Sequence, residues 1–416
     1  MSVPKLRFKE FKEEWKLIKL GKIADKITSG ARDWAQYYSE NGSKFIRMTN
    51  LSREGIHLKL DDLKFVNVKA ESSDGQRTSL IHGDIPISIT AELGKIGWIP
   101  PNFGEAFINQ HTGLVRLKKE QADSLFIAYL LSTAKLNKQI NRLNDSGAKS
   151  GLNLPTIASI NIHLPKISEQ NKIANFFVTI DEKIAQLTQK CELLARYKKG
   201  VMQQIFSQEL RFEDDGDRNF PDWKNDSLLN LSESGFTNGV FNDPSKVGSG
   251  YKLINVLDMY IDLTIDDTKL NLVELSEDEF NRNKVKYGDT FFTRSSLVKE
   301  GIAHSNVYLG SSEDVTFDGH LIRMSPKKDL INPMFFYYLL KISQIRQQFV
   351  TRGKTTTMTT IGQADIATVV LNFPSIKEQT KIANFLTSID EKITEAQTYL
   401  DTVKQYKQGL LQQMFV

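Results

Sequence analysis

A stretch of fourteen residues occurs twice in this chain, and this duplication constrains the fold more than any other feature. Residues 171–184 read NKIANFFVTIDEKI, and residues 380–393 read TKIANFLTSIDEKI. Ten of the fourteen positions are identical, and the copies are offset by 209 residues in a chain of 416. Because self-similarity at a fixed spacing is the signature of a duplicated structural unit, the sequence predicts two similar halves.

Shorter matches recur in the same order in both halves, so the repeat covers nearly the whole chain. They become weaker toward the start of each half, where the two sequences differ most. The clearest pairs are Leu6–Phe8 with Leu210–Phe212, His82–Ile85 with Tyr287–Thr290, Leu114–Leu117 with Leu321–Met324, Phe126–Leu131 with Phe335–Leu340, and Gln203–Phe206 with Gln412–Phe415. This order predicts a domain, a helix, a second domain and a second helix.

Length and composition set limits on the class of protein. A chain of 416 residues is too long for one core, and 40% hydrophobic with 25% charged residues is ordinary for a soluble globular protein. No apolar run is long enough to span a membrane, and the polar N-terminus lacks a signal-peptide core, so we expect a cytoplasmic protein. The single cysteine, Cys191, excludes an internal disulfide framework. A net charge of +4 permits nucleic-acid binding without requiring it.

The repeated segments carry heptad patterns in which apolar residues alternate in steps of four and three. Lys198 and Lys407 interrupt the two patterns at equivalent positions. The apolar positions are Ile173, Phe177, Ile180, Ile184, Leu187, Cys191, Leu194, Val201 and Ile205, then Ile382, Leu386, Ile389, Ile393, Ala396, Leu400, Val403, Leu410 and Met414. We expect an antiparallel coiled coil with a pseudo-two-fold relation between the halves and the domains at opposite ends. Alternatively, each helix packs on its own domain.

The predicted fold class is α+β, with two mixed α/β domains in tandem, separated by the two long helices. Short β-branched and aromatic runs between turn residues predict strands at 84–90 and 289–293, and the apolar stripes at 126–131 and 335–340 predict core helices. The expected boundaries are residues 1–165 for the first domain, 166–210 for the central helix, 211–373 for the second domain and 374–416 for the C-terminal helix.

Motifs of common enzymes are missing from the sequence. It contains no GxxxxGK[ST] loop, no HExxH and no GxSxG, and its six histidines lack metal-ligand spacing. The paired carboxylates Asp181-Glu182 and Asp390-Glu391 are neighbours on predicted helices, where adjacent side chains point in different directions. They form either a solvated helix face or a docking surface repeated in both helices. A duplicated chain of this kind is suited to holding two recognition domains a set distance apart, for example on successive turns of duplex DNA.

The order of domains and helices, the motif K-I-A-x-F…I-D-x-K-I and the terminal QQxF resemble the specificity subunit of type I restriction–modification systems. The resemblance implies two target-recognition domains, each reading one half of an asymmetric bipartite DNA site. It also implies that the helices set the half-site spacing and dock two methylation subunits, which restriction/translocase subunits then join. The chain itself would be non-catalytic and bind no cofactor, while S-adenosylmethionine, ATP and Mg²⁺ would be held by the partner subunits.

Candidate contact residues follow from this resemblance and from the chemistry of DNA recognition, in which cations, hydroxyls and amides reach phosphates and base edges. An ordinary surface loop is the alternative for each position. The candidates for DNA are Arg32, Arg47, Arg53, Arg77, Asn109, Gln110, Lys149, Ser150, Asn153, Arg294, Lys299, His320, Arg352, Lys354, Thr355 and Thr356. The candidates for partner docking and the coiled coil are Ile173, Phe177, Ile180, Asp181, Glu182, Ile184, Leu187, Leu194, Ile382, Leu386, Ile389, Asp390, Glu391, Ile393, Leu400 and Val403.

Two other classes of function compete with the DNA-specificity adaptor. An autonomous binding or scaffold protein would bind DNA tightly and specifically without any partner. An enzyme with an unrecognised catalytic site would methylate or cleave DNA by itself. The missing cofactor loops argue against the enzyme.

Overall fold

The computed structural model describes residues 3–31, 34–68, 72–143, 151–241, 244–261 and 263–416. The chain divides into two compact units, one formed by residues 1–189 with 397–416 and the other by residues 190–396. Each unit therefore contains one α/β domain, the first part of one long helix and the last part of the other. The two units are called unit 1 and unit 2 below.

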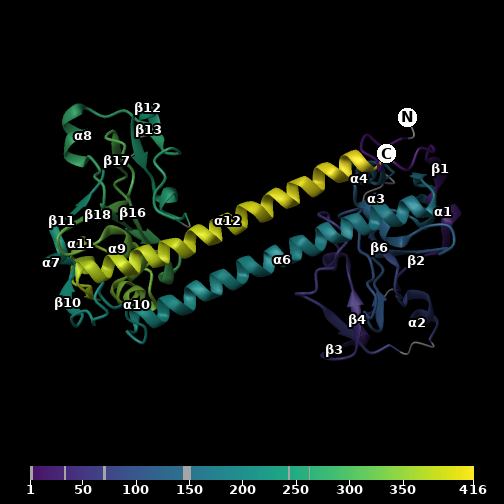
Figure 1. The fold of residues 1–416 in the computed structure, drawn as a ribbon, viewed down its shortest axis with the longest axis horizontal. Coiled ribbons are helices and arrows are strands. Elements are labelled where there is room, and N and C mark those ends of the chain that lie inside the picture. The colour runs from purple at the N-terminus through teal and green to yellow at the C-terminus, as the bar shows by residue number, and fades with distance from the viewer. Residues whose placement is uncertain (1–2, 32–33, 69–71, 144–150, 242–243, 262) are drawn as a thin grey trace. The chain divides into compact units, whose positions relative to one another are not determined.

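Unit 1 is built from short strands, short helices and parts of two long helices (Figure 1). Its strands are β1 (Lys16–Lys19), β2 (Ala24–Ser29), β3 (Tyr38–Ser39), β4 (Ser43–Ile46), β5 (Lys64–Val66), β6 (Ile85–Ser88), β7 (Ala106–Ile108), β8 (Thr112–Leu117) and β9 (Asn161–Leu164). Its helices are α1 (Leu20–Ile23), α2 (Ser73–Thr78), α3 (Ser124–Ser132), α4 (Ala134–Arg142), α5 (Leu154–Ser159) and the start of α6 (Ile167–Phe206).

Unit 2 repeats this succession with additional short strands. Its strands are β10 (Lys224–Ser227), β11 (Ser232–Asn238), β12 (Val247–Ile254), β13 (Asn271–Val273), β14 (Thr290–Thr293), β15 (Ser295–Ser296), β16 (Ser305–Val307), β17 (Val315–Phe317), β18 (Leu321–Pro326), β19 (Lys354–Thr355), β20 (Thr359–Thr360) and β21 (Val370–Phe373). Its helices are α7 (Leu228–Leu231), α8 (Glu277–Asn283), α9 (Pro333–Leu339), α10 (Ser343–Arg352), α11 (Gln363–Ala367) and the start of α12 (Ile376–Met414).

The strand orders confirm the internal repeat at the level of topology. The antiparallel sheet β2-β8-β6 of unit 1 corresponds to β11-β18-β14 of unit 2, where β16 adds a fourth strand. A second sheet contains the order β5-β4-β7 in unit 1 and β13-β12-β17 in unit 2, and in both the last two strands pair in parallel. A third pair of strands, β1-β9 or β10-β21, leads into the long helix. Two halves with different loops therefore share one scaffold.

The repeated Gly-Asp dipeptide before β6 and β14 is explained by a turn and a buried carboxylate. Gly83 and Gly288 have φ of +88° and +94°, which a glycine adopts without the Cβ penalty. Asp84 accepts a hydrogen bond from the backbone of Ile81 and forms an ion pair at 2.7 Å with Arg116 of the neighbouring strand β8. The equivalent Asp289 is also buried, 3.8 Å from Arg323, and burial raises its pKa.

A second repeated network ties the N-terminal arm of each half to the start of a long helix. In unit 1 the buried carboxylate of Glu169 accepts from Arg7 at 2.7 Å and from the indole of Trp15 at 3.3 Å. In unit 2, Glu378 is paired in the same way with the equivalent arginine and tryptophan, Arg211 and Trp223. Since a buried charge is costly unless it is paired, these contacts account for the recurrence of the Leu-Arg-Phe and Trp-Lys segments.

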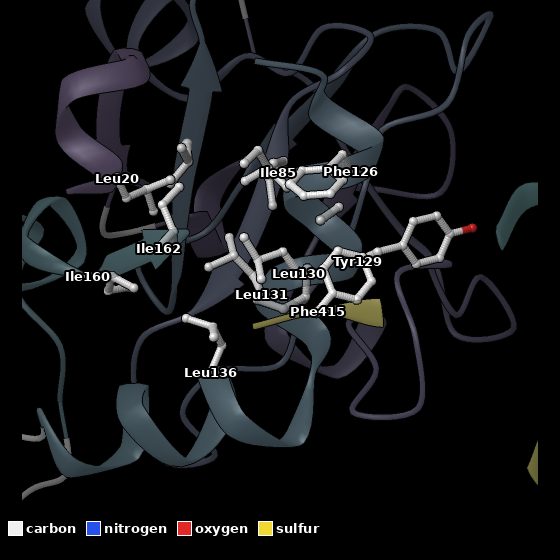
Figure 2. Close-up of a cluster of buried hydrophobic side chains, with 14 of the residues drawn as sticks. Leu20, Ile85, Phe126, Tyr129, Leu130, Leu131, Leu136, Ile160, Ile162 and Phe415 are labelled. Carbon is white, nitrogen blue, oxygen red and sulfur yellow. The ribbon is translucent and has the colours of Figure 1, made fainter. Parts of the chain in front are cut away.

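The predicted core helices are confirmed, because α3 and α9 bury nearly all their apolar side chains. Figure 2 shows Phe126, Leu130 and Leu131 of α3 together with Phe415 from the end of the chain. The Phe415 ring lies 5.2 Å from that of Phe126 and 5.7 Å from that of Phe177. The C-terminus of α12 is therefore part of the core of unit 1.

The helices α6 and α12 are continuous, with 40 and 39 residues, and Figure 1 shows both as unbroken ribbons. In unit 1 the start of α6 meets the end of α12 in antiparallel register, since Phe177 contacts Phe415 and Lys183 lies over the ring of Tyr399. Ile173 and Phe177 also pack into the domain core. Both sequence-based alternatives, helix on helix and helix on its own domain, thus apply to this segment. None of the helices in the described ranges is long and apolar enough to cross a membrane.

Candidate nucleic-acid interface

A small three-stranded sheet in unit 2 brings together two segments that the sequence proposes separately for DNA contact. Its order is β15-β20-β19, with Ser295 opposite Thr360 and Thr355 opposite Thr359. The loop that follows β15 carries Lys299, and β19 supplies Lys354 and Thr355. The structure therefore places cations and hydroxyls from residues 294–301 and 351–360 on adjoining strands and turns.

Two further candidates lie directly beside this small sheet. The backbone N–H of Arg294 donates to the carbonyl of His320 at 3.1 Å, and its guanidinium donates to the carbonyl of Gly319 at 3.2 Å. The imidazole of His320 contacts the buried carboxylate of Asp318 at 2.8 Å, while its side chain is 69% exposed. Arg294 and His320 are thus accessible side chains held by backbone contacts at the end of the sheet β11-β18-β14-β16.

The predicted cations of the 351–357 loop differ in the hydrogen bonds and ion pairs that they already form within the chain. Arg352 donates to Thr368 and to the carbonyl of Gln348, so its guanidinium is engaged at the ends of α10 and α11. The exposed Lys354 lies 3.6 Å from Asp365, while Thr355 shares a hydrogen bond with Thr359 and Thr356 is exposed at the turn. Lys354, Thr355 and Thr356 are thus exposed, whereas Arg352 is partly buried.

Unit 1 has an equivalent sheet end, formed by a bridge between Thr90 and Gly151. The backbone N–H of Ile89 donates to the carbonyl of His111, just as Arg294 does to His320. Gln110 lies beside this histidine, with its amide 3.2 Å from the imidazole. The candidates Arg32, Lys149 and Ser150 lie outside the described residues.

Several unit 1 candidates already have partners within the fold. Asn109 is buried, and its side-chain oxygen accepts from Thr112 and from the backbone of His111. The side chain of Asn153 caps α5. These amides stabilise local turns, so their side-chain oxygens are already occupied as acceptors.

The described candidate arginines of unit 1 lie on separate elements rather than together at the sheet end. Arg47 pairs with Asp62 at 2.8 Å, and Arg77 pairs with Asp74 at 3.2 Å on α2. The exposed Arg53 donates to the side chain of Asn137 at 3.1 Å. Exposed pairs of this kind contribute little to stability and exchange readily with water or a ligand.

The aspartates of the duplicated helix motif have a role that the sequence analysis missed. In unit 1, Asp181 accepts from Lys407 of α12 and from the hydroxyl of Tyr129 at 2.6 Å, and His57 contacts it at 2.9 Å. Burial pushes the pKa of Asp181 up, but the hydrogen bonds from His57, Lys407 and Tyr129 hold the pKa below the usual aspartate range. Burial and the carboxylate together raise the pKa of Tyr129.

Unit 2 contains the same network with the roles of the two helices exchanged. Asp390 of α12 accepts from Lys198 of α6 at 2.5 Å and from the hydroxyl of Tyr338 at 2.7 Å. Both sequence-based alternatives for Asp181 and Asp390, a solvated face and a docking surface, therefore give way to a buried network. Their neighbours Glu182 and Glu391 remain exposed. The signal was present in the sequence, because two lysines interrupt the apolar seams at equivalent positions.

The remaining predicted helix residues divide between core and partly exposed positions. Ile173, Phe177, Leu187, Ile382, Leu386, Ile389 and Leu400 are buried, and Ile180, Ile184, Leu194, Ile393 and Val403 are partly buried. The sequence pattern thus correctly identifies the inward face of both helices. The outward face carries residues outside the heptad seam, including Tyr197 and Tyr406, which are 53% and 59% exposed.

Comparison with known proteins gives this architecture a family. The family described as type I restriction modification DNA specificity domain matches residues 12–195 and 259–405. The chain belongs to this family. The two matched segments fall one in each half, as the internal repeat requires, and the resemblance inferred from the helix motifs is confirmed.

Individual members of the specificity-subunit family are distant in sequence. The chain is 24% identical over 220 residues to the type I restriction enzyme MjaVIII specificity subunit of Methanocaldococcus jannaschii, covering 50% of this chain and 49% of that protein. It is 25% identical over 289 residues to the EcoKI specificity subunit of Escherichia coli, covering 67% of this chain and 60% of the relative. The matches thus span about half to three fifths of these curated relatives.

Solved structures support the fold along the whole chain. The type I restriction–modification S subunit from M. genitalium superposes with a TM-score of 0.59 and 13% identity, covering 100% of this chain and 99% of that one. A chain from work on complex assembly of the type I R-M system gives a TM-score of 0.55 at 15% identity, over 95% and 96% of the two chains. The predicted α+β fold with a tandem pair of domains is therefore confirmed.

Proposed function

We propose that this chain is the DNA-recognition subunit of a type I restriction–modification complex, and that each domain reads one half of an asymmetric bipartite site. The observation that carries the proposal is a duplicated scaffold with diverged loops at one sheet end. The ends around His111 and His320 share backbone contacts but present different side chains. Base readout requires such side chains on a scaffold that orients them, and two different loop sets suit two different half-sites.

The long helices are proposed to set the spacing between the half-sites. A helix of 40 residues is about 60 Å long, which is comparable to nearly two turns of DNA. The Asp–Lys networks fix which residues of α6 and α12 face each other in each unit, because a slipped register would leave buried charges unpaired. Inserting one heptad in each helix should therefore change the spacer and leave the bases read unchanged.

The outward faces of the helices are proposed to dock two copies of a methylation subunit. Tyr197 and Gly200 of α6 recur as Tyr406 and Gly409 of α12, and a Cβ at either glycine would meet nothing within 4 Å among the described atoms. Since a glycine inside a helix costs about 1 kcal/mol, its recurrence without an internal contact favours an external one. In unit 2 the face with Gly200 lines a groove of ≈ 980 Å³.

The docking proposal predicts the stoichiometry of the complex. Single Gly200→Trp and Gly409→Trp variants should each bind one methylation subunit instead of two, as measured by native mass spectrometry. Gly200→Ala should weaken this binding less than Gly200→Trp, because a methyl group intrudes on the contact less than an indole does. Two bound subunits in both tryptophan variants would contradict the proposed docking surface.

The chain is proposed to supply recognition and no catalysis. S-adenosylmethionine would be bound by the methylation subunits, and ATP and Mg²⁺ by restriction/translocase subunits. Mapping of methylated adenines tests this division directly. After co-expression with a methylation subunit in a host without DNA methylation, a split asymmetric motif modified on both strands is expected.

Two outcomes would contradict the proposed adaptor. If the two proteins co-purify and are soluble but leave the genome unmodified, a scaffold function is favoured. If the purified chain alone methylates or cleaves DNA, it is an enzyme. A domain exchange provides the positive control, because replacing residues 1–165 by those of another family member should change one half of the motif only.

A further inference from the structure

Three apolar side chains are exposed at the small sheet of unit 2. Leu297 is 86% exposed, Val298 is 62% exposed, and Met358 is 37% exposed. Leu297 is the most exposed large apolar side chain among the described residues. Single exposed apolar residues are common on protein surfaces, so their arrangement decides whether they have a meaning.

The strand register places two of these side chains opposite each other. Ser295 pairs with Thr360 and Ser296 with Thr359 in an antiparallel ladder. Continuing this register by one residue brings Leu297 to the position opposite Met358. Because opposite residues of an antiparallel pair lie on the same face, the ladder ends in two apolar side chains from separate loops. We call this pair the apolar tip.

Positive charge and hydroxyl groups surround the apolar tip. Exposed Arg294 and Lys299 flank Leu297 in the sequence, and exposed Lys354 and Thr356 precede Met358 in the adjoining strand and turn. Cations at this spacing suit contacts to phosphates, whereas a leucine side chain can neither pair with a phosphate nor donate a hydrogen bond to it. The arrangement therefore fits a ligand that has negative charge at its rim and apolar groups deeper inside.

The described loop of unit 1 that corresponds to residues 294–303 has no exposed leucine. This loop runs from residue 89 to 94 between the hydrogen-bonded pair Ser88 and Lys95, while the loop of unit 2 runs from 294 to 303 between Thr293 and His304. The leucine of the shorter loop, Leu93, is 3% exposed and belongs to the domain core. A loop leucine needed by the scaffold would be exposed in both halves, whereas one that differs suits a half-site determinant.

We propose that Leu297 and Met358 enter the major groove and contact the C5-methyl group of thymine in the half-site that unit 2 reads. This inference rests on the proposed function. The major groove admits a two-stranded β-ribbon, and thymine presents there the one apolar group that distinguishes its base pair. Flanking cations would hold the phosphates on either side while the apolar tip reaches the base edge.

The test uses the complex with the methylation subunit and duplexes that contain its mapped target. Each thymine of the two half-sites is replaced in turn by uracil, which lacks only the methyl group. The wild-type complex should lose about fourfold in affinity at one or two thymines of a single half-site. Leu297→Ala, alone or with Met358→Ala, should bind thymine and uracil duplexes equally well at those positions.

Leu229→Ala provides the matched control, because Leu229 is 53% exposed on α7, away from the small sheet in sequence and in strand pairing. It should retain the full thymine preference. The inference is overturned if Leu297→Ala keeps the thymine preference, or if the half-site read by unit 2 contains no thymine on either strand. Absence of any specific binding by the wild-type complex would instead overturn the proposed function itself.

Discussion

Replacing Lys407 by methionine should destabilise unit 1 strongly. The side chains of Lys407 and Asp181 are 7% and 8% exposed, so their ion pair is almost fully removed from water. Methionine keeps most of the length of the side chain but leaves the carboxylate with His57 and Tyr129 as its partners. Breaking a buried pair on one side costs about 3–5 kcal/mol. We therefore expect the free energy of local unfolding of unit 1 to fall by this amount.

The double variant Lys407→Met with Asp181→Leu separates the cost of the unpaired charge from the loss of the contact. Because buried ion pairs are often replaced by apolar residues at little cost, the double variant should recover most of the stability. The mirror variant Lys198→Met is the matched control for unit 2. Lys198 and Asp390 are 20% and 11% exposed, so water remains closer and the loss should be smaller.

Hydrogen exchange by mass spectrometry on the full chain measures these effects locally, which matters because a chain with two units need not unfold in one step. Lys407→Met should raise exchange in peptides from residues 397–414 and leave those from 376–396 unchanged. Lys198→Met should do the reverse. A change of less than about 1 kcal/mol in Lys407→Met, or a double variant less stable than the single, would refute the reasoning.

The remaining predictions concern pH and three single positions. The pKa of Asp181 is depressed in the folded state, so its contribution to stability is present above the ordinary aspartate pKa of about 3.9 and is lost as the pH falls through the folded value. Urea unfolding followed by circular dichroism should therefore show a drop in stability below about pH 4. The Lys407→Met/Asp181→Leu variant should lack this drop. Glu169→Gln should cost about 3 kcal/mol in urea unfolding, because it removes the buried carboxylate that pairs with the partly buried Arg7, and equal stability would contradict the network. Gly200→Ala should raise the free energy of unfolding by about 1 kcal/mol, and a lower melting temperature would reveal a contact that the fold does not show. Gly30→Ala should lower the melting temperature and soluble yield, because its Cβ would lie 2.1 Å from the backbone of Asn109.

The regular features of the fold could be predicted from the sequence because they depend on local pattern. The duplicated motif and the heptads indicate the long helices, and the apolar stripes indicate α3 and α9. The partner of each polar residue could not be predicted in this way. Asp181 and Lys407 are 226 residues apart in sequence, and no local rule joins them. Two lysines in equivalent seam positions opposite two equivalent aspartates were a usable signal, but only once an antiparallel register was assumed.

The candidate DNA contacts stay predictions, and the structure shows only where each described side chain lies. Arg294, His320 and Lys354 come together because strands distant in sequence meet at one sheet end, and their residue types fit the expected chemistry. Asn109 and Asn153 have the same chemistry but serve the backbone, since turns and helix caps select the same amides as DNA does. Residue type alone does not distinguish these two uses. The apolar tip was not among the candidates, because exposed leucines are not a usual sign of DNA contact.

The crossed Asp–Lys contacts have a consequence for how such a chain arises and how it fails. The first half carries Asp181 and Lys198, and the second carries Asp390 and Lys407. Each of the two ion pairs therefore takes its acid from one half and its base from the other. A half-length ancestor would satisfy both contacts by pairing with a second copy of itself, and fusion of the two copies turns that encounter into an intramolecular one. For the same reason, two full-length chains can exchange their long helices and form a domain-swapped dimer. At high protein concentration, swapped dimers that retain every native contact are the expected misassembly.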